Sequence, residues 1–172
     1  MRLVEGTVRV DDVDDFVAGL DAVAVETGTT IQAFDARYVV SRRHLERAVE
    51  LADRAIDRDE NVARDRAVEI LLYAAGRRQI TDALELGVST GPNRVVVLVD
   101  AGVDGDVGGS AAADAAVAVR SDVLDTAEPT LGDYDAERVR AYFDVDDAEL
   151  DVVHGDLEAL VCERVALLVV ER

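Results

Sequence analysis

A short apolar run near the middle of the chain, RVVVLVD at residues 94–100, limits the folds that this sequence can adopt. The run has no alternation of apolar and polar residues, so both faces of the strand that it predicts must be buried. Two further strands are predicted, one at residues 2–10, where apolar and polar residues alternate, and one at residues 29–40, which are rich in β-branched and aromatic residues. A small sheet with a buried central strand requires helices to cover it.

Helical periodicity predicts those covering elements. Apolar residues recur at steps of three and four in residues 11–24, 42–58, 63–75, 80–87 and 155–172, and two shorter capped helices are predicted at residues 133–143 and 146–153. The apolar residues VALLVV near the carboxyl end are equally compatible with a final strand. We therefore predict an α+β fold for residues 1–172, a single compact domain with a small mixed or antiparallel sheet packed with several helices.

The charge of the chain is strongly negative. It contains 37 Asp and Glu residues against 18 Arg and no Lys, which gives a net charge of −19. This composition is typical of proteins from salt-loving archaea, where charge is screened over about 3 Å at 1 M salt. We interpret the charge as adaptation to the solvent rather than as a site for a basic partner. The chain shows no leader peptide and no apolar run of about 18 residues, which predicts a cytoplasmic protein without membrane contact.

No catalytic, metal or cofactor motif is legible. The single cysteine, Cys162, excludes an internal disulfide, and His44 and His154 lack a ligand-like spacing. The glycine-rich loop at residues 101–110 has the wrong spacing for a dinucleotide fingerprint, and Asp104 and Asp106 lack the remaining ligands of a calcium loop. We expect no enzymatic activity, no cofactor and no small-molecule substrate.

The arginines are concentrated in one part of the chain. Residues 37–78 contain ten Arg against eight acidic residues, whereas the rest of the chain is strongly acidic. Pairs of arginines fall at or near the ends of predicted helices: Arg42 and Arg43, Arg64 and Arg66, and Arg77 and Arg78. If these helices pack side by side, the arginines form one basic patch. The alternative is that they are ordinary exposed residues paired with nearby acids, such as Glu46, Glu50, Asp65 and Glu69.

The stretch EILLYAAGRRQITDALELGV, residues 69–88, supports the interpretation of the arginines as one basic patch. Gly76 predicts a helix end in left-handed conformation, and a second helix starts soon after it. The start of a helix leaves backbone N–H groups without partners, and Arg77, Arg78 and Gln79 add side-chain donors there, which predicts an anion or phosphate site. Tyr73 lies one turn earlier and is either a core residue or a surface for base stacking.

This stretch resembles the signature of the kinase-binding, tRNA-recruiting subunit of the KEOPS complex, the TPRKB-like family. Its GRRQI core is close to the GKRQI form that is typical of archaeal members. The segments IQAFDARYVVSRRHLERAVELA and VCERVALL support the resemblance, which spans nearly the whole chain apart from residues 101–130.

The resemblance implies a non-catalytic subunit of the complex that transfers a threonylcarbamoyl group to adenosine in tRNA. Such a subunit binds the kinase-like ATPase and the single-stranded CCA end of tRNA. The motif positions are Gly76, Arg77, Arg78, Gln79 and Ile80, and the predicted RNA-binding set is Arg77, Arg78, Gln79, Arg64, Arg42 and Arg43. The predicted kinase-docking residues are Leu160, Val161, Val165 and Leu168, for which core packing competes. A purely structural adaptor and a small-molecule-binding α+β domain that uses the loop after residue 100 are the alternatives.

Salt limits how RNA can be bound in such a cytoplasm. If about 5 phosphates were neutralised, the logarithm of single-strand affinity would fall with log salt at a slope of about −3.5. We therefore expect binding to depend on stacking and on hydrogen bonds to unpaired bases. Arginine suits this role better than lysine because its planar guanidinium can stack on a base and donate two parallel hydrogen bonds.

Overall fold

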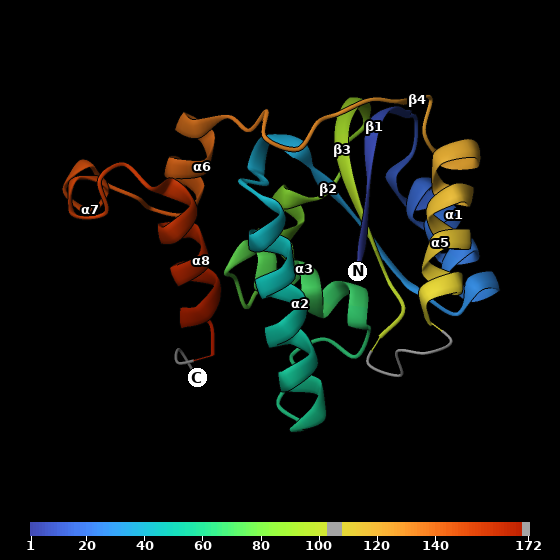
Figure 1. The fold of residues 1–172 in the computed structure, drawn as a ribbon, viewed down its shortest axis with the longest axis horizontal. Helices are drawn as coiled ribbons and strands as arrows, with labels where there is room; N and C mark the ends of the chain where they lie inside the picture. The colour runs from blue at the N-terminus through green and yellow to red at the C-terminus, as the bar shows by residue number, and fades with distance from the viewer. Residues whose placement is uncertain (103–107, 170–172) are drawn as a thin grey trace. The chain divides into compact units, whose positions relative to one another are not determined.

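A four-stranded antiparallel sheet with the order β2-β3-β1-β4 organises one part of the structure (Figure 1). The computed structural model describes residues 1–102 and 108–169. The chain forms two compact units, Met1–Asp35 with Gly87–Thr130 and Ala36–Leu86 with Leu131–Arg172. The sheet belongs to the first unit and contains the strands β1 (Arg2–Val10), β2 (Thr30–Asp35), β3 (Gly91–Asp100) and β4 (Thr126–Ala127). The predicted α+β class is confirmed, and the prediction of a single domain stays a prediction.

Strand β3 is the central strand that its apolar run predicts. It pairs with β1 in a register that places Leu3 opposite Leu98, and with β2 in a register that places Ile31 opposite Val99. The five residues from Val95 to Val99 are all 0% exposed, so both faces of the strand are buried. The strand predicted at residues 29–40 is shorter than expected, because β2 ends at Asp35 and a 3₁₀ turn, Ala36–Tyr38, follows it.

Helices α1 (Val13–Thr27) and α5 (Gly108–Ala118) cover one face of this sheet (Figure 1). Alternate residues of the strands make the core beneath them, including Val4, Val8, Ile31 and Val97. A short π-helical turn, Val119–Val123, continues α5 and leads to β4. Gly6 is required where β4 pairs with β1, because a Cβ atom at this position would lie 2.2 Å from the carbonyl oxygen of Thr126.

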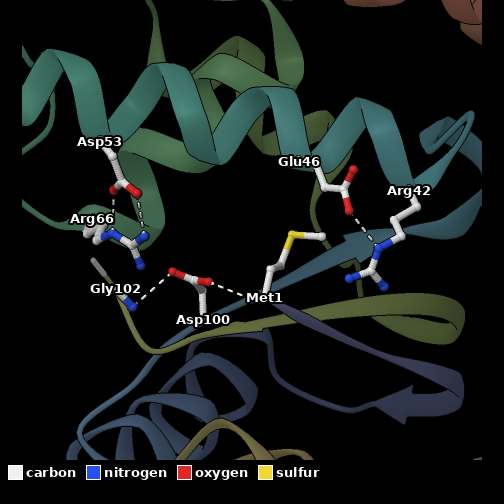
Figure 2. Close-up of polar contacts among 7 residues, drawn as sticks. All are labelled: Met1, Arg42, Glu46, Asp53, Arg66, Asp100 and Gly102. Atoms are coloured by element: carbon white, nitrogen blue, oxygen red, sulfur yellow. Dashed lines mark hydrogen bonds and ion pairs between the residues drawn. The ribbon is translucent and has the colours of Figure 1, made fainter. Parts of the chain in front are cut away.

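The second unit is built on an antiparallel hairpin of helices α2 (Arg42–Asp57) and α3 (Arg66–Ala75). Ser41 caps α2 by accepting a hydrogen bond from the backbone N–H of His44. At one end of the hairpin, Arg66 donates two hydrogen bonds, of 2.7 and 2.8 Å, to the carboxylate of Asp53 (Figure 2). At the other end, Nε2 of His44 donates to the carbonyl oxygen of Ala74 at 2.8 Å.

Helix α3 begins three residues later than predicted. Its N-cap is Asp65, and the preceding segment is held by Glu69, which is 1% exposed. The Glu69 carboxylate accepts hydrogen bonds from the backbone N–H groups of Val62 and Ala63. Glu69 is therefore occupied with the loop between the two helices and is not the surface partner of an arginine.

Four further α-helices of the described residues belong to the second unit. They are α4 (Ile80–Ala83), which continues into a 3₁₀ turn (Leu84–Leu86), then α6 (Ala136–Tyr142), α7 (Asp147–Val152) and α8 (Leu157–Leu167). Helix α8 packs against α2 and α3, whereas α7 buries none of its own side chains. The alternative of a carboxyl-terminal strand is not seen within residues 157–169, because α8 continues to Leu167 and a turn follows it.

Two predictions about the glycine-rich loop fall outside the residues that the structure describes. Asp104 and Asp106 belong to residues 103–107, and α5 begins directly after them. Among the described residues, no group of side chains could hold a metal ion. In the same part of the chain, none of the helices has the length and apolar character that crossing a membrane requires.

His44 is a buried, neutral histidine. It is 0% exposed, and its ring lies 5.9 Å from that of Phe143 in edge-to-face geometry. Burial lowers the pKa of His44 to about 4, and the hydrogen bond to Ala74 opposes this effect only in part. Because a carbonyl can only accept, the Nε2 atom carries the proton of the neutral ring.

The buried histidine predicts an acid-sensitive stability. The unfolded chain binds a proton at His44 below pH 6.5 and the folded chain only near pH 4, so the stability is complete above about pH 6.5 and falls below it. Between about pH 7.5 and pH 5 this site should lower the free energy of unfolding by about 2 kcal/mol. Chemical denaturation across this range should show that the free energy of unfolding varies less with pH in His44→Gln than in the wild-type protein. The same change at the exposed His154 is the control, and an equal flattening there would contradict the assignment.

Candidate functional site

The motif at residues 76–80 follows the carboxyl end of α3. Gly76 adopts the left-handed conformation, with a φ of +59°, as its sequence position predicts. Its N–H donates to the carbonyl oxygen of Tyr73 at 3.0 Å, and the N–H of Arg77 donates to that of Leu72 at 3.1 Å. These two bonds form a Schellman cap, so the helix break is a hydrogen-bonded structure with a defined exit direction.

Helix α8 lies directly against this break. A Cβ atom added to Gly76 would lie 3.4 Å from the carbonyl oxygen of Arg164 and 3.7 Å from the Cβ of the same residue. A side chain larger than alanine at position 76 would therefore meet the backbone of α8. The positive φ is what favours glycine here, because a Cβ atom would make only ordinary van der Waals contact with α8.

The side chain of Arg77 points toward α6. Its guanidinium donates to the carbonyl oxygen of Tyr142 and lies over the ring of that residue, with Cζ 4.8 Å from the ring centroid. The nearest carboxylate oxygen, on Asp144, is 4.0 Å away, and the Arg77 side chain is 34% exposed. Arg77 is thus engaged by a backbone carbonyl and an aromatic face, rather than by a carboxylate clamp.

Arg164 approaches the same helix end from α8. Its Nε donates to the carbonyl oxygen of Phe143 at 3.1 Å, and its Nη2 donates to that of Asp144 at 3.2 Å and to the carboxylate of Glu149 at 2.6 Å. Two guanidiniums therefore hold three consecutive carbonyls, at residues 142, 143 and 144, and we call this arrangement the α6 clamp. Positive charge is favourable here because the carboxyl end of a helix carries partial negative charge.

An aromatic cluster supports the α6 clamp. The Tyr142 ring lies 5.5 Å from that of Tyr38 and 5.0 Å from that of Phe143, both in edge-to-face geometry. The Tyr142 hydroxyl donates to the carbonyl oxygen of Asp82 at 2.9 Å. Burial raises the pKa of Tyr142 to about 12, against the opposing charge of Arg77, so the hydroxyl stays protonated as this hydrogen bond requires.

The residues after Arg77 are exposed. Arg78, Gln79 and Ile80 all face solvent, as does Leu84, and within residues 1–102 and 108–169 Arg78 has no hydrogen-bond or ion-pair partner. Helix α4 is a single turn, and the backbone N–H of Arg77 is already used by the Schellman cap. The side chains of Arg78 and Gln79 remain as donors for a ligand. Tyr73 is 4% exposed and belongs to the core, which decides between its two interpretations.

The structure brings four of the predicted arginines to one end of the α2–α3 hairpin. Arg42 and Arg43 lie in the first turn of α2, next to His44, and Arg77 and Arg78 follow Ala74, to which His44 is bonded. Arg42 is paired with Glu46 at 2.7 Å (Figure 2), whereas Arg43 is exposed. Arg64 lies at the opposite end of the hairpin, beside Asp65 and Arg66, and the 16 residues of α2 separate the two ends by about 24 Å.

The four residues predicted to dock a kinase are buried within the second unit. Leu160, Val161, Val165 and Leu168 are all 6% exposed or less, so in this structure they attach α8 to its own unit. The other side of α8 forms a groove of about 490 Å³ with α2, lined by Arg43, Glu46, Arg47, Glu50, Ala159, Cys162, Glu163 and Ala166. Burial raises the pKa of the Cys162 thiol.

Sequence reasoning missed Tyr142 and Arg164 as parts of this site. A signal for Arg164 was present, because it occupies a position in the apolar helical repeat of residues 157–168 where a charged residue requires a partner. No comparable signal marks Tyr142. Its role depends on a backbone carbonyl and a ring face that only the folded chain brings to Arg77.

The second unit is thus α-helical, and its capped helix break presents an exposed arginine beside exposed apolar side chains. Residues 14–168 match the family described as kinase binding protein CGI-121, and the chain belongs to this family. The resemblance to the TPRKB-like KEOPS subunit is thereby confirmed. No curated protein matches the chain.

The two adjacent arginines should differ in their effect on stability. Arg77→Ala removes a hydrogen bond to Tyr142 and a cation–π contact, and we expect the free energy of unfolding to fall by about 1–2 kcal/mol. Arg78→Ala is the matched control and should change it by less than about 0.5 kcal/mol. Urea denaturation of the two variants measures the difference, and equal effects would contradict the roles assigned to the two side chains.

Proposed function

We propose that this chain is a non-catalytic, cytoplasmic subunit of a haloarchaeal KEOPS complex, which modifies tRNA with a threonylcarbamoyl group. In this role it binds the kinase-like ATPase subunit and the single-stranded CCA end of tRNA. Membership of a kinase-binding family supports the first contact. The observation that carries the second is the exposed Arg78, which has no partner among the described residues and lies in the GRRQI motif.

The surface around Arg78 suits unpaired nucleotides. Ile80 is 46% exposed and Leu84 56% exposed, and their spacing of four residues places them on the same side of the short helical segment. A guanidinium beside apolar side chains offers both hydrogen bonds and a surface for base stacking, which unpaired bases require. Because these contacts are less sensitive to salt than phosphate pairing, they suit binding in a concentrated cytoplasm.

The end of the hairpin that carries the motif is the proposed RNA surface. Arg43 lies at this end. Arg77 does not face the RNA in this proposal, and its hydrogen bond to Tyr142 holds the backbone that leads to Arg78. Gln79 adds an exposed amide with both donor and acceptor groups. Arg64 lies at the other end of the hairpin, outside this surface. We therefore leave Arg64 out of the RNA-binding residues that the sequence suggested.

Charge reversal at one arginine tests the RNA contact. Arg78→Glu should weaken the binding of tRNA by at least about tenfold, in about 1 M KCl as well as in about 0.1 M KCl, because it removes stacking and hydrogen bonds as well as charge. Arg64→Glu is a matched control, since Arg64 is also exposed and the net charge changes equally. Fluorescence anisotropy with labelled tRNA measures both affinities.

The same assay on tRNA without its CCA end separates the alternatives. If wild-type protein binds both RNAs equally, the CCA end is not the ligand. If Arg78→Glu and Arg64→Glu weaken binding equally, the effect is one of net charge and not of the motif. The absence of any RNA binding, together with intact kinase binding, would favour the purely structural adaptor.

We propose the groove between α2 and α8 as the kinase-docking surface. The residues predicted for docking are buried, so a partner that docks on α8 without unfolding it must contact the other side of the helix. That side is lined by small residues, Ala159, Cys162 and Ala166, which allow close approach of a partner. Arg43 and Arg47 on α2, together with Glu163 on α8, supply charges of both signs at its edges.

A bulky substitution in this groove tests the kinase contact. Ala166→Arg should weaken the binding of the kinase-like ATPase by at least about tenfold, because it fills the groove and adds a charge. Val152→Arg, on the 79% exposed Val152 of α7, is the control and should bind the ATPase normally. Calorimetric titration measures both affinities, and an unchanged affinity of folded Ala166→Arg would place the docking surface elsewhere.

A further inference from the structure

We propose that Arg164, on α8, is a positioning residue for the RNA-binding motif. As part of the α6 clamp it holds the end of α6 in place, so that Arg77 can bind the Tyr142 carbonyl. Arg77 in turn sets the direction in which the chain continues to Arg78. This proposal rests on the RNA contact proposed above and assigns a second role to α8, beside kinase docking. It follows from two contacts that Arg164 makes, one through its backbone and one through its side chain.

The backbone contact supports the helix break directly. The carbonyl oxygen of Arg164 lies 3.4 Å from the position of a Cβ on Gly76, which is van der Waals distance. Gly76 is the residue whose left-handed conformation turns the chain from α3 toward Arg77. The backbone of α8 therefore limits how far the Schellman cap can move on one side.

The side-chain contact acts through the end of α6. Arg77 needs the Tyr142 carbonyl in a defined position, and Arg164 holds the next two carbonyls of the same backbone, those of Phe143 and Asp144. Asp144 adopts a left-handed conformation with a φ of +51°, which costs free energy for a residue other than glycine. The Arg164 hydrogen bond stabilises this residue, and with it the direction of the carbonyls that precede it.

Arg164 is poorly placed to contact RNA itself. Its side chain is 24% exposed, and three acceptors already occupy its guanidinium. One of them is Glu149, a carboxylate whose pKa is lowered by its hydrogen bond with Arg164. By contrast, Arg78 is exposed and has no partner among the described residues. The two arginines should therefore affect RNA affinity through different physical mechanisms.

Affinity measurements at several salt concentrations test the positioning role of Arg164. Arg164→Gln should lower the affinity for tRNA by about tenfold at each salt concentration and leave the slope of log affinity against log salt unchanged. Arg78→Gln, which removes the proposed stacking and hydrogen-bond contact itself, should lower the affinity by at least as much. Anisotropy titrations from about 0.1 M to 1 M KCl give both quantities.

Glu149→Gln is the matched control. It removes the ion pair with Arg164 but leaves the bonds from Arg164 to the carbonyls of Phe143 and Asp144, so tRNA affinity should stay within about twofold of wild type. An equal loss in Glu149→Gln and Arg164→Gln would overturn the proposal, because α7 and not the α6 clamp would then be responsible. Arg164→Lys, which can reach fewer acceptors, should lie between wild type and Arg164→Gln.

Hydrogen exchange gives a readout that needs no RNA. The amide of Arg77, bonded to Leu72, should exchange faster in Arg164→Gln than in Glu149→Gln, while the amides of the α2 interior should not change. Unchanged exchange at residues 76–79, or unchanged tRNA affinity in folded Arg164→Gln, would overturn the proposal. If Arg164→Gln does not fold, the same two criteria apply to Arg164→Lys. Failure of wild-type protein to bind tRNA would instead refute the proposed function.

Discussion

The second unit depends on two arginines that bind the carboxyl end of one short helix. Arg77 comes from the helix break and Arg164 from α8, and together they hold the carbonyls of residues 142, 143 and 144. These carbonyls end α6 and would otherwise lack helical partners. Because the two guanidiniums reach them from different elements, α3, α6 and α8 are joined at one point. The motif takes its conformation from this junction as well as from its own sequence.

Two groups of arginines in this acidic chain differ in their partners. Arg66, Arg77 and Arg164 are at least partly buried, and each makes hydrogen bonds that connect separate elements. Arg43, Arg64 and Arg78 are exposed. A planar guanidinium suits the first group because it can reach two acceptors at once, as Arg66 does with Asp53. The same planarity suits the second group if its ligand is an unpaired base.

The family, the motif and the geometry support a consistent function. The chain belongs to a kinase-binding family, and the groove between α8 and α2 is the docking surface proposed for that partner. The proposed RNA surface lies at the end of the hairpin where Arg43 and Arg78 are exposed. Arg164 belongs to the helix proposed to dock the kinase and contacts Gly76 of the motif. The two proposed binding surfaces therefore share a structural element, although their ligands differ.

The sequence alone determined the features that depend on neighbouring residues. These include the buried central strand β3, the Ser41 cap of α2 and the left-handed Gly76, because apolar runs, capping side chains and positive φ are local properties. Only the tertiary structure decided which of two adjacent arginines is held and which is free, and which side of α8 is buried. The first outcome depends on the carbonyl of Tyr142, 65 residues from Arg77, and the second on the packing of α8 against α2 and α3. No local pattern records such contacts.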